Sequence, residues 1–221
     1  MSIIAHTDPL SPASEAFRVL RTNLQFAGLD QPLKSVLITS ASPGEGKSTT
    51  AANLAVTCTQ SGMNVCLVDA DLRRPTLHKS FRVKNWCGLT TALIGEGGLE
   101  AALQPGGLDG LTLLTSGPLP PNPAEMLGSG RMVELLAELE RRFDLVIVDT
   151  PPVLAVTDAA VLASRMDGVL LVVRSGQVPR QQVAQARDAL AAVQARLLGV
   201  VLGAVKPEKK ADYYYSYGTG R

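Results

Sequence analysis

The stretch Ile38-Thr39-Ser40-Ala41-Ser42-Pro43-Gly44-Glu45-Gly46-Lys47-Ser48-Thr49 joins an apolar run to a helical pattern. Apart from Ala41 in place of a first glycine, it follows the pattern G-x-x-x-x-G-K-[ST] of phosphate-binding loops. Its glycines let backbone N–H groups close around phosphate oxygens, and the following helix adds its positive N-terminal dipole. Lys47 can reach the β- and γ-phosphates of a nucleotide, and the Ser48 hydroxyl can bind Mg²⁺. The stretch therefore predicts a P-loop for Mg·ATP rather than a glycine-rich turn without a ligand.

Apolar runs rich in β-forming residues recur on both sides of this loop. They cover residues 35–39, 65–68, 111–114, 145–148, 169–173 and 199–202. Because these runs do not alternate strictly with polar residues, they are typical of parallel strands covered on both faces. Helical patterns lie between them, at about 48–62, 124–143, 157–164 and 179–197. This order predicts a doubly wound, mostly parallel α/β sheet.

Two flanking segments stand apart from a single predicted domain at residues 1–205. At the N-terminus, Ser11 and Pro12 suit the cap and first position of a helix at about 11–27. One face of this helix is apolar, with Phe17, Leu20 and Leu24. Another stripe is polar, with Glu15, Arg18 and Arg21, in which Glu15 can pair with Arg18. At the C-terminus, residues 206–221 have no amphipathic period, so we expect a flexible tail.

Two of the apolar runs end in carboxylates. Residues 145–148 lead into Asp149-Thr150-Pro151-Pro152, which has the Walker B form, and residues 65–68 lead into Asp69-Ala70-Asp71-Leu72-Arg73. Either alone could be a simple turn. Beside a P-loop, however, they predict one carboxylate in the Mg²⁺ shell and another that orients or deprotonates a nucleophile. The residues leave open whether that nucleophile is water or a hydroxyl.

The composition excludes several classes of protein. Of the 221 residues 46% are hydrophobic and 19% charged, which indicates a globular chain rather than a disordered one. The net charge of +1 gives no field for nucleic acid, so no nucleic-acid partner is expected. The cysteines Cys58, Cys66 and Cys87 lack C-x-x-C spacing, which disfavours zinc and disulfides and favours a reducing compartment. With neither a signal peptide nor a run of ~20 apolar residues, we expect a soluble, cytoplasmic protein.

All four tyrosines of the chain, Tyr213, Tyr214, Tyr215 and Tyr217, lie in its last nine residues. Tyrosine is useful in cores and interfaces, so its confinement to a tail is hard to explain by packing. A tail that adds a strand or binds a partner is one interpretation. A cluster of phosphate acceptors is the sharper one, because each phosphate adds about −1.5 to −2 charges.

Together these motifs resemble the bacterial tyrosine kinases (BY-kinases) that regulate capsule and exopolysaccharide synthesis. That family is similar to partitioning-type P-loop ATPases rather than to eukaryotic protein kinases. The resemblance covers nearly the whole chain. It rests on the Walker A form at 42–48, the D-x-D-x-R motif at 69–73, the Walker B D-x-P-P at 149–152, the E-x-x-R-x-x-R motif at 15–21, the stretch at 117–125 and the tyrosine tail.

The resemblance implies an ATP-dependent protein-tyrosine kinase that phosphorylates the tail of a neighbouring subunit. Residues 42–49 would hold ATP, and Ser48, Asp71 and Asp149 would hold Mg²⁺. Asp69 would activate the tyrosine hydroxyl, although Asp71 could exchange roles with it. The family's late strand often carries asparagine, which residues 201–205 lack, so the adenine contacts stay open.

The implied partners are copies of the chain and a membrane system. Glu15, Arg18 and Arg21 would join subunits in a ring, an octamer by the resemblance, which tail phosphorylation would loosen. The cytoplasmic segment of a separate transmembrane activator would recruit the kinase to the inner face of the membrane, beside polysaccharide synthesis and export proteins. An exposed charged stripe, however, is more often simply solvated.

Two alternatives remain open. A partitioning or cluster-carrier ATPase of the same superfamily would use water as the nucleophile. The partitioning proteins have a second lysine early in the P-loop, where this chain has Ser42, and a cluster carrier would need paired cysteines. An ATP-gated scaffold without kinase activity is the other alternative.

Overall fold

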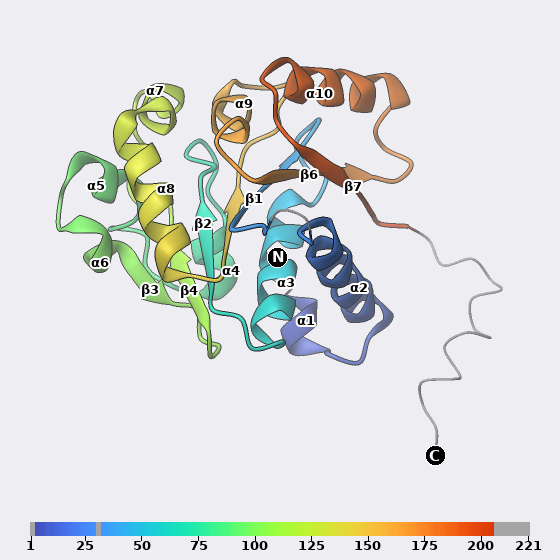
Figure 1. The fold of residues 1–221 in the computed structure, drawn as a ribbon, viewed down its shortest axis with the longest axis horizontal. Helices are drawn as coiled ribbons and strands as arrows, with labels where there is room; N and C mark the ends of the chain where they lie inside the picture. The colour runs from blue at the N-terminus through green and yellow to red at the C-terminus, as the bar shows by residue number, and fades with distance from the viewer. Residues whose placement is uncertain (1–2, 30–31, 206–221) are drawn as a thin grey trace.

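Seven strands form one sheet in the part of the protein that the computed structural model describes, residues 3–29 and 32–205. Their order across the sheet is β3-β4-β2-β5-β1-β6-β7 (Figure 1). In chain order they are β1 (Ser35–Ser40), β2 (Val65–Asp69), β3 (Leu103–Pro105), β4 (Leu111–Leu114), β5 (Leu145–Asp149), β6 (Gly168–Arg174) and β7 (Leu197–Gly203). Every neighbouring pair is parallel except β3 with β4. The predicted doubly wound, mostly parallel sheet is confirmed.

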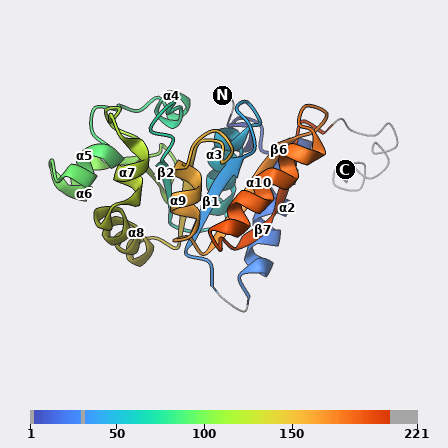
Figure 2. The same ribbon diagram turned by 90° about the horizontal axis from the view of Figure 1, so that it is seen from above.

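Helices cover both faces of this sheet. The helices are α1 (Ile4–Thr7), α2 (Pro12–Ala27), α3 (Lys47–Thr59), α4 (Leu77–Phe81), α5 (Leu89–Ile94), α6 (Gly98–Ala102), α7 (Pro123–Gly128), α8 (Gly130–Arg142), α9 (Asp158–Ala163) and α10 (Arg180–Ala192). Figure 2 shows α8, α9 and α10 on one side of the sheet and α3 and α4 on the other. In Figure 1, α1 and α2 lie beside α3.

Alternate residues of each central strand feed two separate cores. In β1, Leu37 packs into the core under α8, α9 and α10, whereas Val36 and Ile38 pack into the core under α2 and α3. All six β1 residues are buried, as are all five residues of β2 and of β5. Burial on both faces explains why these strands are continuously apolar in sequence.

The register of the central strands brings the predicted site together. Asp69 at the end of β2 is the partner of Asp149 at the end of β5, and Ile38 of β1 is also opposite Asp149. Because the three strands are parallel neighbours, their carboxyl ends meet at one edge of the sheet. The P-loop and both acidic motifs therefore emerge side by side.

The structure corrects three sequence predictions. The helix predicted at 124–143 is two helices, because Ser129 is extended and its hydroxyl caps α8 by accepting the Met132 N–H. The helix predicted at 179–197 ends at Ala192, and residue 197 already begins β7. β7 is not covered on both faces, since it is an edge strand on which Val200 and Leu202 are 50% and 62% exposed.

The shortest helices and the shortest strand were not predicted from the sequence. α1, α4, α5, α6 and the three-residue β3 are each shorter than seven residues, too short to give a clear period. The predicted cap at Ser11 is confirmed, because its hydroxyl accepts the Ser14 N–H at the start of α2. Among residues 3–29 and 32–205, the helices are too short or too polar to span a bilayer.

Candidate active site

The P-loop runs from the end of β1 to the start of α3. Gly44 and Gly46 have φ angles of 82° and 96°, a region where residues with a Cβ are strained, so both glycines are required by the backbone. Gly46 is the N-cap of α3 and offers no side chain to the first N–H groups of that helix. Those N–H groups and the positive end of the helix dipole are therefore free to receive an anion.

Glu45 supports the loop from inside. Its side chain is buried, and its two carboxylate oxygens accept the backbone N–H groups of Ser42 and of Arg174, the latter at 3.2 Å. Arg174 lies at the end of β6, so Glu45 ties the P-loop to the neighbouring strand. Any contact of residue 45 with a phosphate must come from its backbone, because its carboxylate is directed to these two amides. Pro43, by contrast, is exposed at the tip of the loop.

Lys47 is held by one of the predicted carboxylates. Its Nζ lies 3.1 Å from Oδ2 of Asp71, and both side chains are largely buried. The other Asp71 oxygen, Oδ1, accepts the backbone N–H of Arg74 at 3.0 Å. The motif after β2 is thus folded back as a tight turn, and that turn meets the P-loop lysine directly.

Asp69 has one engaged oxygen and one free oxygen. Oδ2 accepts the backbone N–H groups of Thr76 and Leu77 at 3.0 and 2.9 Å, at the start of α4. Oδ1 is buried and has no hydrogen-bond partner in the described part of the chain. Burial raises the pKa of this carboxyl, the N–H groups of Leu77 and Thr76 oppose the shift, and the Asp71 charge adds to it. Asp69 is therefore able to accept a proton at a pH closer to neutral than an ordinary aspartate.

Asp149 is the most exceptional of the three carboxylates. It is fully buried, and both of its oxygens lack a hydrogen-bond partner among residues 3–29 and 32–205. Burial raises its pKa most strongly, the nearby positive charge of Lys47 opposes this, and the charges of Asp69 and Asp71 reinforce it. A buried carboxylate without partners is costly to the free protein, so its presence indicates a ligand that is bound during function.

The loop after Asp149 is fastened to β1. The Thr150 N–H and hydroxyl both donate to the Ile38 carbonyl, at 3.1 and 2.9 Å. The Thr39 hydroxyl donates to the carbonyl of Pro151, and the Val153 N–H donates to Ser40. Asp149 is consequently fixed relative to the strand that begins the P-loop.

These residues fit a bound Mg²⁺. Mg²⁺ prefers oxygen ligands, takes few of them from protein and fills its shell with water and phosphate oxygens. Ser48 and Asp149 present such oxygens beside the P-loop, and Asp71 does so once it leaves Lys47. In the described ranges, no three His, Cys, Asp or Glu side chains form a ready cluster for a metal ion. This pattern suits an ion that arrives with a nucleotide.

Sequence reasoning missed the partner of Arg73. Arg73 Nε and Nη2 donate to the two carboxylate oxygens of Asp158, each at 2.9 Å, and Asp158 is fully buried at the start of α9. Asp158 lies nine residues after Asp149, where an acidic residue in the first turn of a helix is common. No local pattern marks it, because its partner is 85 residues away.

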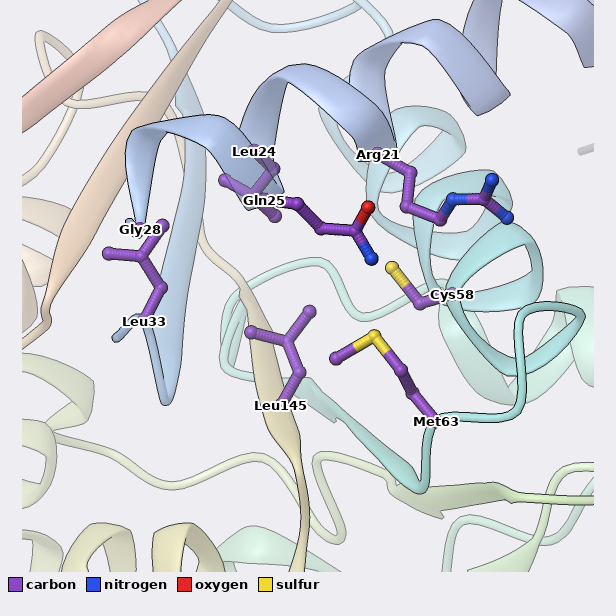
Figure 3. A pocket seen from close by; sticks show the side chains of 8 residues that line it. All are labelled: Arg21, Leu24, Gln25, Gly28, Leu33, Cys58, Met63 and Leu145. Atoms are coloured by element: carbon purple, nitrogen blue, oxygen red, sulfur yellow. The ribbon is translucent and has the colours of Figure 1, made fainter. Parts of the chain in front are cut away.

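The polar stripe of α2 divides into two parts. The predicted pair is confirmed, with Arg18 Nε 2.7 Å from the Glu15 carboxylate on the exposed side. Arg21 instead turns toward the body of the protein, where its Nη1 donates to the Thr57 carbonyl of α3 at 3.0 Å. A small cavity of about 70 Å³ is lined by Arg21, Leu24 and Gln25 of α2. Figure 3 shows Cys58 close to Arg21 and Gln25 at this cavity. The three residues therefore do not form one exposed face.

The predicted phosphate acceptors Tyr213, Tyr214, Tyr215 and Tyr217 lie outside the described residues. The described residues end at Val205, which follows β7. The predicted tail therefore stays a prediction.

Comparisons with known proteins show which family this chain belongs to. A family model described as "ParA: NUBPL iron-transfer P-loop NTPase" matches residues 33–206. The tyrosine-protein kinase YwqD of Bacillus subtilis (strain 168) is 50% identical over 218 residues, 99% of this chain and 92% of its own. The putative tyrosine-protein kinase CapB of Staphylococcus aureus is 35% identical over 98% of this chain and 95% of its own.

A longer relative and its solved domain complete the comparison. The tyrosine-protein kinase etk of Escherichia coli (strain K12) is 40% identical over 97% of this chain, which corresponds to 29% of its own length. The structure titled the kinase domain of Escherichia coli tyrosine kinase ETK superposes with a TM-score of 0.91 at 38% identity, over 95% of this chain and 82% of that one. This chain belongs to the bacterial tyrosine kinases of capsule and exopolysaccharide systems, which are built on the ParA-type P-loop NTPase fold.

Proposed function

We propose that this kinase uses Mg·ATP to phosphorylate Tyr213, Tyr214, Tyr215 and Tyr217 in the tail of another copy of the chain. The observation that carries the proposal is the unpartnered Asp149 carboxylate, buried beside Lys47 and in register with Asp69. An acidic cluster of this kind next to a P-loop can organise a phosphoryl transfer, because that reaction depends mainly on positioning and on neutralising charge. The tyrosine cluster of the sequence supplies matching acceptors.

The nucleotide would be held by the P-loop at residues 42–49. Its backbone N–H groups and the start of α3 receive the phosphates, and Lys47 turns from Asp71 toward the β- and γ-phosphates. That movement frees Oδ2 of Asp71, which joins Ser48 and Asp149 as a ligand for Mg²⁺. Bound Mg²⁺ would neutralise the negative charge of the phosphates.

Asp69 is the proposed base. Its Oδ1 has no partner in the described chain, whereas both oxygens of Asp71 are engaged in the free protein. In the proposed step the tyrosine oxygen attacks the γ-phosphorus, the bond to the β-phosphate oxygen breaks, and the tyrosine proton passes to Asp69. The products are phosphotyrosine and ADP. Asp71 in place of Asp69 is the alternative assignment.

Assembly would bring the tail of one subunit to the site of the next. We infer a ring-like homo-oligomer, an octamer, in which the exposed Glu15–Arg18 pair contacts a neighbouring subunit. Arg21 holds α2 against α3 within its own subunit through the Thr57 carbonyl. Phosphates on several tail tyrosines would repel one another and loosen the ring. The resulting cycle of assembly and release would regulate polysaccharide synthesis and export.

Recruitment to the membrane would need a separate protein. This chain spans 92% of YwqD but 29% of the E. coli kinase, so the family has members that consist of little beyond this unit and members with much more. We infer that the cytoplasmic segment of a transmembrane activator binds the kinase and holds it at the inner face of the membrane.

Mapping of phosphotyrosine tests the proposal. After incubation with Mg·ATP, mass spectrometry should find phosphate on the tyrosines at 213–217. A matched sample with Lys47→Met alone should stay unlabelled, because its P-loop cannot hold the phosphates. ATP hydrolysis without any phosphotyrosine would instead favour a partitioning-type ATPase, and nucleotide binding without turnover would favour an ATP-gated scaffold.

A further inference from the structure

We propose that Asp158 is a positioning residue that acts through Arg73 to set the spacing between the loops that follow β2 and β5. Asp158 lies outside the P-loop and outside both acidic strand ends. The inference rests on the proposed function in one respect, because it takes Asp71 and Asp149 as the protein carboxylates that hold Mg²⁺.

The contact between the two residues is a fork. Both Asp158 oxygens accept from Arg73, one from Nε and the other from Nη2, at 2.9 Å each. The Asp158 side chain is fully buried, whereas the Arg73 side chain is 41% exposed. A fork of two parallel hydrogen bonds restricts orientation as well as distance, which a single ion pair between flexible side chains does not.

The fork joins two loops that start from neighbouring strands. Asp69 and Asp149 are paired in register, and each is followed by a loop that leads to a helix, α4 or α9. Arg73 lies in the first loop, two residues after Asp71, and Asp158 lies where the second loop ends. The fork therefore closes a ring over the edge of the sheet that carries the carboxylates.

The two loops also meet directly at the strand ends, where the Ala70 N–H donates to the Asp149 carbonyl at 2.8 Å, and the remaining contacts hold each loop to other parts of the protein. Asp71 Oδ1 accepts the Arg74 N–H, and Asp69 caps the start of α4. Thr150 and Val153 bind β1. Beyond the strands, the link between Arg73 and Asp158 is the side-chain contact that sets the Asp71 turn against the Asp149 loop.

This placement predicts a selective defect. The P-loop keeps its shape through Glu45, Ser42 and Arg174, none of which contacts the fork. Loss of the fork should therefore leave metal-free nucleotide binding intact and weaken the part of binding and catalysis that depends on Mg²⁺. Residues that orient the ligands of a metal typically change metal affinity or activity by about 10- to 100-fold when they are removed.

The test compares a packed replacement with a surface control. Arg73→Met together with Asp158→Leu removes the fork but fills its volume, so that no buried charge is left unpaired. The control, Arg142→Gln with Glu138→Gln, removes another partly buried charged pair on α8, together with the contact of Arg142 with Glu100 of α6. Arg73→Lys and Asp158→Asn, which keep the side-chain size but break the fork, provide the same comparison if the double variant does not fold.

Four quantities are measured for each full-length variant: the Tm, the Kd of ADP in EDTA, the Mg²⁺ concentration for half-maximal ADP binding, and the phosphorylation rate. For Arg73→Met with Asp158→Leu we expect a Tm near that of the wild type and an ADP affinity in EDTA within about twofold. We expect the Mg²⁺ concentration for half-maximal ADP binding to rise about tenfold. The phosphorylation rate should fall at least as much, and the Arg142 control should change neither.

A double variant with the wild-type response to Mg²⁺ would overturn the inference and leave the fork a purely structural contact. A loss of ADP binding in EDTA would overturn it as well, because the defect would then lie in the P-loop. Failure of the proposed function is a separate result: the wild type would form no phosphotyrosine, while its Mg²⁺-dependent ADP binding would still test the fork.

Discussion

Asp149 and Asp158 are both fully buried, lie at the two ends of one loop, and have opposite surroundings. Asp158 is satisfied by the Arg73 fork, whereas both Asp149 oxygens lack a partner in the described chain. In the free protein, burial of the paired Asp158 carboxylate is compensated by its hydrogen bonds, whereas burial of the Asp149 carboxylate without hydrogen bonds costs folding free energy. The difference is that the Asp158 end of the loop is complete in the free protein, whereas the Asp149 end has free oxygens that a ligand could bind.

The same contrast applies to the neighbouring groups of the site. Asp71 is engaged twice in the free protein, by Lys47 and by the Arg74 N–H, and Asp69 is engaged by the start of α4. Asp69 Oδ1 joins the two Asp149 oxygens as a buried acceptor without a partner. Three of the six buried side-chain atoms that lack a partner in the described chain thus belong to carboxylates at the edge of the sheet where ligands bind in folds of this type.

Substitution of Asp149 should have the largest effect, on the rate of phosphorylation. Asp149→Asn keeps the shape of the side chain but removes the charge that would hold Mg²⁺, so the phosphorylation rate should fall about 10³-fold, or about 4 kcal/mol in activation free energy. Quantitative phosphotyrosine assays at saturating ATP measure it. Asp188→Asn, at an exposed pair with Arg187, is the control and should keep the wild-type rate.

Stability at the satisfied end should show the next largest effect. Arg73→Ala leaves the fully buried Asp158 carboxylate without its partner, so the protein should lose about 3 kcal/mol of unfolding free energy. Chemical denaturation followed by circular dichroism measures the loss. Glu138→Ala, which breaks a partly exposed pair on α8, should cost less than about 1 kcal/mol. Equal losses in the two variants would remove the distinction between a buried fork and a surface pair.

Substitution of Asp149 should have the opposite effect and raise the unfolding free energy rather than lower it. Asp149→Asn should stabilise the nucleotide-free protein by about 1–3 kcal/mol above neutral pH, because it removes a buried charge without partners. Burial raises the folded-state pKa of this carboxyl above its unfolded value, so the folded protein binds the proton more tightly.

The pH dependence follows from that sign. The wild type should match the variant below about pH 3, where the carboxyl is protonated in both states, and should lose stability relative to it as the pH rises from the unfolded-state pKa of about 3.9 through the raised folded-state pKa. Denaturation in EDTA across this range measures the difference. A wild type that gains stability relative to the variant with rising pH would show that Asp149 is stabilised as an anion.

The smallest effects are expected on α2. Glu15→Ala with Arg18→Ala should change the unfolding free energy by less than about 1 kcal/mol, because the pair is exposed. Arg21→Ala should cost about 1 kcal/mol, since it removes a hydrogen bond from a charged group to the Thr57 carbonyl. Light scattering of the first variant should show a smaller oligomer than the wild type. An unchanged mass would return Glu15 and Arg18 to the solvated surface.

Sequence patterns were sufficient for the parts of this molecule that depend on local chemistry. Continuous apolar runs predicted the six longer strands, and the central strands β1, β2 and β5 have such runs because both of their faces are buried. The glycines and Lys47 identified the P-loop, and the residues that end β2 and β5 identified the carboxylates, because each of these features is contained in a few neighbouring residues.

Features that depend on contacts between distant residues could not be predicted in this way. Asp158 has no local signal, since only the fold brings it to Arg73. The inward turn of Arg21 depends on α3, and the exposure of β7 depends on its place at the edge of the sheet. Glu45 was expected to bind the nucleotide, but its carboxylate is directed to Ser42 and Arg174.

A mixture of two variants tests whether phosphate is transferred from the ATP site of one copy of the chain to the tail of another. The donor carries Tyr→Phe at positions 213, 214, 215 and 217 with an intact P-loop, and the acceptor carries Lys47→Met with an intact tail. With Mg·ATP, mass spectrometry should find phosphotyrosine at 213–217 of the acceptor, although neither protein becomes labelled alone. An acceptor that stays unlabelled beside a wild type that labels itself would contradict transfer between subunits.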